Sequence, residues 1–148
     1  MPTPAQPDTA IRGEQIAALQ DVSLLLTRRV RKHSQTDLTM SQISALSTIL
    51  RHGPIRVGEL ARREQISKSS TTRLVAKLEA MGYLQRSADP DDGRSFVVGI
   101  TPNGHELLAS ARARANDYLV HQIGRLSEDD RLAILAALPS LQRLTGLS

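Results

Sequence analysis

The residues with the plainest chemistry lie between Lys68 and Met81, where hydroxyls and cations recur at helical spacing. At about 100° per residue, a helix over this stretch has one polar face that lacks acids. That face carries Ser69, Arg73, Ala76, Lys77 and Ala80. The opposite, mainly apolar face carries Thr71, Leu74, Val75, Leu78 and Met81. Cations and small polar groups on a narrow helix suit the phosphates and base edges of a DNA major groove.

The stretch that follows this helix predicts a β-hairpin. Ser67 is a suitable N-cap for the helix, and Gly82 supplies the left-handed conformation favoured just past its end. The residues that alternate with polar or small neighbours, as in half-buried strands, are Leu84, Arg86, Phe96, Val98 and Ile100. Between them, residues 88–94 form a run of turn formers that ends in Arg94. A basic tip of this kind is able to reach a minor groove or the flanking backbone.

A short helix over residues 57–64 and a turn over residues 65–67 precede the cationic helix. Two short helices joined by such a turn have the dimensions of a helix-turn-helix. A single amphipathic helix with charges is more often only a solvated surface. The preceding helix, the hydroxyl-rich helix start and the arginine-tipped hairpin together favour a winged helix-turn-helix that binds double-stranded DNA.

Composition narrows the classes of function. The chain has 148 residues and a net charge of +4, and residues 51–87 alone hold eight basic and three acidic residues. The cationic excess therefore coincides with the proposed DNA-reading segment. Aromatic residues make up only 2% of the chain, which disfavours base stacking on single strands and predicts an aliphatic, mainly helical core.

The sequence predicts neither an enzyme nor a cofactor. It has no cysteine, and it lacks a nucleophile elbow, a phosphate loop and a paired-carboxylate signature. Its four histidines have no pair at the three- or four-residue spacing of helical metal ligands, so no metal site is expected. It also lacks an apolar run of membrane-spanning length and a secretory signal, which favours a cytoplasmic protein without a membrane partner.

The expected organisation is a single domain over residues 1–148, mainly α with a small β-hairpin wing (α+β). Residues 1–10, rich in proline, are expected to be a disordered tail. Residues 38–100 form the winged helix-turn-helix lobe. Residues 11–36 and 101–148 form long helices whose broad apolar stripes exceed what this lobe covers, so we expect them to join two copies as a homodimer.

Local signals mark the starts of three of these helices. Thr39 and Gln42 have the spacing of a capping box. Pro102 follows Thr101 at a first helical position, where its missing amide costs nothing. Ser127 is followed by three acids, which are favourable at the positive end of a helix.

At this point the sequence resembles the MarR-type (multiple-antibiotic-resistance) regulators, which are dimeric winged-helix transcription factors. The second helix begins Leu-Thr-x-x-Gln at residues 38–42, and residues 72–82 match a Thr-Arg-Leu-Val-x-x-Leu-Glu-x-x-Gly recognition helix. The wing matches Asp-Pro-x-Asp-x-Arg at residues 89–94, and a Leu-Thr-x-x-Gly step corresponds to residues 100–104, with Ile100 in place of leucine. The resemblance is continuous from Leu38 to about Leu108.

The resemblance implies a set of DNA contacts. Ser69, Ser70 and Arg73 are expected at base edges or phosphates. Arg94 is expected in the minor groove, oriented by an ion pair with Asp92. Two departures stand out: Gly93 replaces a common second arginine, and Arg56 replaces a hydroxyl cap. The full set expected to bind or support DNA is Arg56, Lys68, Ser69, Ser70, Thr72, Arg73, Lys77, Arg86, Asp92, Arg94 and Ser95.

The function implied is a repressor that binds a near-palindromic operator as a dimer and is released by a small, aromatic or lipophilic effector. The residues expected to line an effector site are Leu19, Ser23, Leu26, Leu46, Leu50 and Arg51. Two alternatives remain open: a metal-responsive regulator of the same fold, and a protein-interaction module that does not bind DNA.

Overall fold

The computed structural model describes residues 11–147, and the expected tail at residues 1–10 lies outside the described residues. Six helices and one two-stranded sheet make up the described chain. They are α1 (Gly13–Ser34), α2 (Met40–His52), α3 (Val57–Glu64), α4 (Lys68–Ala80), β1 (Leu84–Ala88), β2 (Phe96–Ile100), α5 (Pro102–Gly124) and α6 (Glu128–Thr145). The predicted fold class, mainly α with a β-hairpin wing, is confirmed.

The helix starts form where local chemistry predicts them. At α2 the Thr39 hydroxyl accepts the Gln42 N–H (3.2 Å), and the Thr39 N–H donates to Gln42 Oε1 (2.8 Å). Ser67 caps α4, Thr101 caps α5 and Ser127 caps α6, each by accepting the N–H three residues on. These side chains satisfy amides that have no partner inside the helix.

The sheet has one partner that the sequence did not reveal. β1 and β2 pair antiparallel, from Leu84 opposite Ile100 to Ala88 opposite Phe96. Ile55 adds a third position, because it exchanges both backbone hydrogen bonds with Val98 (2.9 and 3.1 Å). The predicted alternation is wrong in β2, where Val97 is buried as well as Val98 and Phe96 is exposed.

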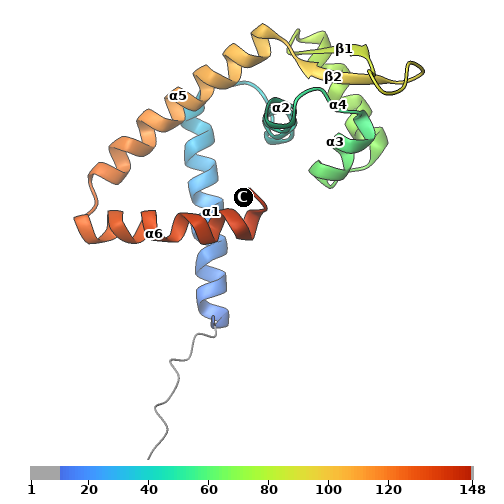
Figure 1. Cartoon of the computed structure of the whole chain (residues 1–148). Coiled ribbons are helices and arrows are strands. Elements are labelled where there is room, and N and C mark those ends of the chain that lie inside the picture. The colour runs from blue at the N-terminus through green and yellow to red at the C-terminus, as the bar shows by residue number, and fades with distance from the viewer. Residues whose placement is uncertain (1–10, 148) are drawn as a thin grey trace, which may run out of the picture.

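The core lies within the winged lobe, and the outer helices extend beyond it. Buried aliphatic residues of α2, α3, α4 and both strands form one cluster, which Leu108 of α5 joins. Figure 1 shows α5 running from the hairpin to α6, while α1 extends away from the lobe. Helix α6 has no buried residue, so most of its apolar surface is uncovered in a single chain.

A tight joint connects α4, the wing and α5. The Thr101 hydroxyl donates to the Gly82 carbonyl (2.6 Å) and accepts the Gly104 N–H (3.1 Å), while the Thr101 N–H donates to the Tyr83 carbonyl (3.0 Å). A Cβ at Gly104 would lie 2.4 Å from the Tyr83 carbonyl oxygen, so only glycine permits this approach. The start of α5 is thereby fixed to the end of α4.

Side-chain contacts hold the C-terminal end of α1 against the middle of α5. The His33 ring stacks on Tyr118 with 3.9 Å between centroids. Arg114 Nε donates to the Ser34 carbonyl (2.7 Å), which satisfies a free acceptor at the end of α1. These contacts fix the position of α1 relative to α5 at the end of α1.

Candidate nucleic-acid interface

Helix α4 buries the centre of one face and exposes the other, while Leu74 is half-buried and Met81, just past the helix, is exposed. Thr71, Val75 and Leu78 have no exposed surface. Their burial fixes the rotation of the helix, and it turns Ser69, Thr72, Arg73 and Lys77 to the outside. Figure 1 shows α4 beside α3 and below the hairpin, at one end of the molecule.

The first turn of α4 holds its hydroxyls in a connected group. The Ser67 hydroxyl accepts the Ser70 N–H (3.1 Å) and donates to Ser70 Oγ (2.9 Å). Thr71 and Thr72 donate to carbonyls four residues earlier. Ser69 is exposed and Ser70 is half-buried, so Ser69 and Thr72 are the hydroxyls best placed for an external partner.

Acidic residues neutralise the cations of α3 and β1. Glu59 pairs with both Arg62 and Arg63, and Glu79 accepts from Arg86 Nε (2.7 Å). Arg86 also lies over the Phe96 ring, 4.4 Å from its centroid. The pairing with Glu79 raises the pKa of Arg86 and occupies the side chain, so Arg86 is less available to phosphates than its sequence position suggests.

The cations on the exposed face of α4 remain unpaired. Within residues 11–147, Lys68, Arg73 and Lys77 have no carboxylate oxygen within 4.0 Å. The same holds for Arg94 in the wing. These four side chains keep their full charge for a partner outside the chain.

The structure places Arg56 differently from the expectation of a phosphate contact. Arg56 Nε donates to Asp89 Oδ2, at the base of the wing. The Asp89 side chain is only 3% exposed and also accepts the Asp91 N–H (2.9 Å) and the Ser95 hydroxyl (3.1 Å). Arg56 above all, then the Asp91 N–H, lowers the pKa of Asp89 from 3.8 to about 2.

The predicted ion pair between Asp92 and Arg94 is wrong. Asp92 Oδ1 instead accepts the backbone N–H of Arg94 (3.1 Å), and the Asp92 carbonyl accepts the Ser95 N–H (3.0 Å). Asp92 therefore shapes the turn, because a short carboxylate closes onto amides two residues on more readily than it reaches a side chain. The Arg94 side chain stays exposed.

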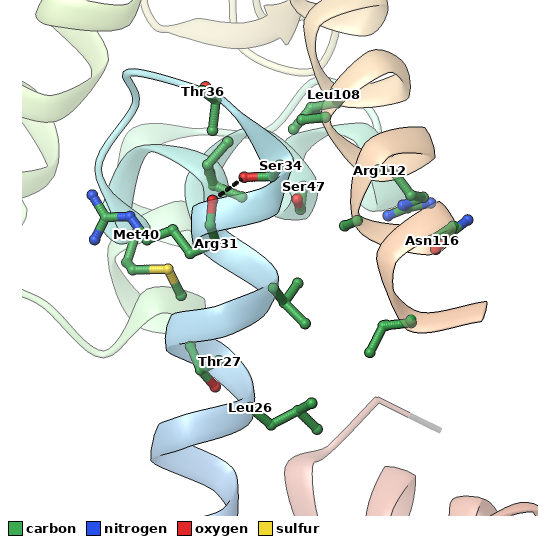
Figure 2. A pocket seen from close by; sticks show the side chains of 15 residues that line it. Leu26, Thr27, Arg31, Ser34, Thr36, Met40, Ser47, Leu108, Arg112 and Asn116 are labelled. Atoms are coloured by element: carbon green, nitrogen blue, oxygen red, sulfur yellow. Dashed lines mark hydrogen bonds between the residues drawn. The ribbon is translucent and has the colours of Figure 1, made fainter. Parts of the chain in front are cut away.

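A cavity of about 460 Å³ lies between α1, α2 and α5. Figure 2 shows its lining, with Leu26 and Thr27 from α1 on one side and Leu108 from α5 on the other. The small side chains of Ala111 and Ala115 leave room on the α5 side of the cavity. Arg31 and Arg112 are the two cationic residues that line the cavity. Such a mostly apolar cavity with a few charged groups suits a small organic anion.

The expected effector-lining residues are dispersed. Leu26 lines this cavity, whereas Leu19 and Ser23 line a separate shallow depression along α1. Leu46 is fully buried in the core, Leu50 packs against the core and Arg51 is exposed. Of the six expected residues, Leu26 alone lines this cavity, so the prediction is wrong for Leu46 in the core and for the others as lining of this cavity. The apolar stripe of α2 looked the same whether it faced a core or a ligand.

Asp89 and the α5 lining were not singled out in the sequence. The pairing of Asp89 with Arg56 joins positions 33 residues apart, for which the chain gives no local signal. The small residues Ala111 and Ala115 did give a signal, since two alanines four residues apart permit a thin helix wall. Across residues 11–147, no three metal-ligating side chains gather, and no helix is long and apolar enough to cross a membrane.

Comparisons with known proteins decide the family. The MarR family model matches residues 38–96. A helix-turn-helix-type transcriptional regulator of Mycobacterium leprae is 36% identical over 115 residues, which cover 75% of this chain and 80% of the relative. This chain belongs to the MarR family. It is therefore a DNA-binding transcriptional regulator and not an enzyme, as the sequence predicted.

Further comparisons agree with this MarR-family assignment. The transcriptional repressor NicR of Pseudomonas putida is 28% identical over 124 residues, covering 78% of both chains. A transcriptional regulator of Pseudomonas aeruginosa superposes with a TM-score of 0.79 at 33% identity, covering 88% of this chain and 93% of that one. A MepR variant of S. aureus, bound to an oligodeoxyribonucleotide, shares the fold with a TM-score of 0.66 at 20% identity, covering 90% and 97%.

The lowered pKa of Asp89 predicts how acid destabilises this MarR-family chain. Because folding favours the carboxylate, its contribution to stability is complete above the unfolded pKa of 3.8 and is lost as the pH falls towards 2. Between these pH values, the free energy of unfolding should fall more steeply in wild type than in Asp89→Asn. Urea unfolding at a series of pH values measures this, and identical pH dependence in both proteins would contradict the assignment.

Proposed function

We propose that two copies of this chain bind a near-palindromic operator as a repressor and leave it when a small lipophilic anion binds. The observation that supports this best is the charge pattern of the winged lobe. The arginines that precede and lie within α3, and Arg86 of β1, are paired with acids, whereas the cations of the exposed α4 face and the wing tip are unpaired among the described residues. An unpaired cationic surface attracts a polyanion and releases its counterions.

Each exposed group has a proposed role on DNA. Arg73, in the middle of α4, reads a base edge in the major groove, with Ser69 and Thr72 beside it. Lys68 and Lys77 lie near the two ends of the helix and contact phosphates. Arg94 enters the adjacent minor groove, whose negative potential attracts it. Ser70 and Ser95 support these contacts from half-buried positions.

The proposed dimer follows from uncovered apolar surface. Helix α6 exposes leucines at three-residue steps along its length, and α1 exposes Ile16, Leu19, Val22 and Leu25. A second copy, packed by a two-fold axis, would cover both sets at once. Residues 11–36 and 101–148 thus serve as dimerisation helices, and residues 38–100 as the DNA-binding lobe. Homodimers are typical of the family.

A two-fold dimer places two α4 helices in successive major grooves, about 34–36 Å apart. Its operator is then near-palindromic, because each half-site meets the same residues. Repression follows if the bound dimer covers a promoter, and the similarity to the repressor NicR supports this direction of control.

The cavity between α1, α2 and α5 is the proposed effector site. Its walls belong to helices that connect the dimer to the DNA-binding lobe, so its contents affect the spacing of the two α4 helices. A ligand that binds better in a misaligned dimer shifts the population away from the DNA-bound state. Arg31 and Arg112 favour a carboxylate head, and Leu26, Leu108 and Leu119 favour an apolar body.

Arg73→Ala should weaken binding to an operator duplex by about 1–3 kcal/mol if Arg73 reads a base edge. Fluorescence anisotropy with operator and random duplexes measures this. The control is Arg125→Ala, an exposed arginine at the end of α5, which should change neither affinity. Equal weakening on both duplexes would instead make Arg73 a phosphate contact.

Leu135→Glu should convert the dimer into a monomer, because a carboxylate would be buried in the apolar interface between two α6 helices. Leu135 is 61% exposed in the single chain, so the monomer itself should remain folded. Sedimentation equilibrium measures the mass, and circular dichroism checks the fold. Ser140→Glu adds the same charge on the opposite side of α6 and should stay dimeric. A dimeric Leu135→Glu protein would show that α6 is not the interface.

A side chain that fills the cavity should abolish the response to an effector and leave DNA binding intact. A panel of benzoate, naphthoate and decanoate is screened by thermal unfolding, and a ligand that binds raises the midpoint and releases operator DNA. Ala115→Phe should keep DNA binding and lose both ligand effects, since its ring occupies the cavity. Ala113→Phe, on the exposed side of α5, is the control and should respond like wild type. A response that persists in Ala115→Phe would exclude this cavity as the site.

A further inference from the structure

Among the described residues, the wing loop that begins at Asp89 is tied to the body of the lobe by a side-chain contact with Arg56. Arg56 precedes α3 directly and follows Ile55, whose backbone is bonded to Val98 of β2. From this fixed position, Arg56 Nε donates to the carboxylate of Asp89, where the wing loop begins. The contact therefore links the start of α3 to the loop that carries Arg94.

The Asp89 carboxylate also closes the wing loop on itself. Its two oxygens accept from the Asp91 N–H (2.9 Å) and the Ser95 hydroxyl (3.1 Å), in addition to Arg56. The Asp89 N–H donates to the Ser95 carbonyl (3.1 Å), so the two ends of the loop are joined by backbone and side chain. With three donors on one buried carboxylate, the side chain has a single arrangement.

In the described part of the chain, the rest of the wing tip is held only by hydrogen bonds within its own turn, in which Asp92 accepts the backbone N–H groups of Arg94 and Ser95. Residues 91–94 are all exposed, and Gly93 adds backbone freedom. An exposed loop that has no contact with the rest of the lobe loses conformational entropy when it enters a groove. Anchoring its base limits that loss, because Arg94 then samples a narrower set of positions.

We propose that Arg56 and Asp89 form a latch that positions the wing so that Arg94 reaches the minor groove. In this arrangement, Arg56 and Asp89 are positioning residues that strengthen binding without touching DNA. The proposal rests on the proposed DNA-binding function and adds to it residues that act through Arg94.

For the DNA affinity of Asp89→Asn, the latch and simple electrostatics predict opposite changes, so the two can be distinguished. Asp89→Asn removes a negative charge from the wing, and charge alone should tighten binding to a polyanion. Loss of the latch should instead weaken it, by about tenfold and no more than Arg94→Ala does. Asp91→Asn is the matched control: it makes the same charge change three residues from Arg94, and its carboxylate accepts no hydrogen bond among the described residues.

The experiment measures duplex affinity by fluorescence anisotropy, with a duplex that the wild-type protein has selected from a random-sequence pool. The variants are Asp89→Asn, Asp91→Asn, the charge-restoring pair Arg56→Gln with Asp89→Asn, and each of these combined with Arg94→Ala. The latch predicts weaker binding for Asp89→Asn and for the pair, unchanged or tighter binding for Asp91→Asn, and little further loss in the Arg94→Ala background.

Hydrogen–deuterium exchange provides a readout that does not need DNA. Amides of residues 91–95 should exchange faster in Asp89→Asn than in wild type, while those of β1 and β2 should be unchanged. Equal exchange at the wing, or tighter DNA binding by Asp89→Asn than by wild type, would overturn the latch. If the wild-type protein selects no duplex, both the proposed DNA-binding function and the latch are wrong. If the wild-type protein binds a duplex and Asp89→Asn binds it equally well, only the latch is wrong.

Discussion

The placement of carboxylates decides which positive charges of this chain are free to meet DNA. Glu59, Glu79 and Asp89 each accept from arginines of the winged lobe and so neutralise the base of the wing and the surface of α3. The exposed face of α4 has no such acid. A modest net charge of +4 is thereby concentrated where a narrow helix can enter a groove. The proposed affinity for DNA depends on this concentration, because paired cations lose much of their attraction for phosphates.

The remaining architecture connects the helices of the proposed dimer to this surface. Thr101 bonds to the end of α4 and to the first turn of α5, and Gly104 allows the two to approach closely. Further along, α5 lines the cavity and then continues to α6. The cavity and α4 are thus linked through one short segment with several hydrogen bonds, which suits the proposed release of DNA by an effector.

Sequence reasoning succeeded where a few neighbouring residues determine the outcome. Helix caps at Thr39, Ser67 and Thr101 involve partners three residues away, and the wing turn is closed by its own aspartates. It failed where the partner is distant. Arg56 pairs with Asp89 rather than standing free for a phosphate, and Leu46 lies in the core rather than in a cavity. A charge pattern shows where cations are, but only the folded chain shows which of them are neutralised.

The central claim is that two unpaired cationic surfaces bind one duplex. Sedimentation of the protein with a labelled operator across a salt series tests it most directly. The account predicts two chains per duplex and a logarithm of the binding constant that falls linearly with the logarithm of salt concentration, by about 0.9 for each phosphate contacted. One chain per duplex, or an affinity that does not change between about 50 and 200 mM salt, would contradict it.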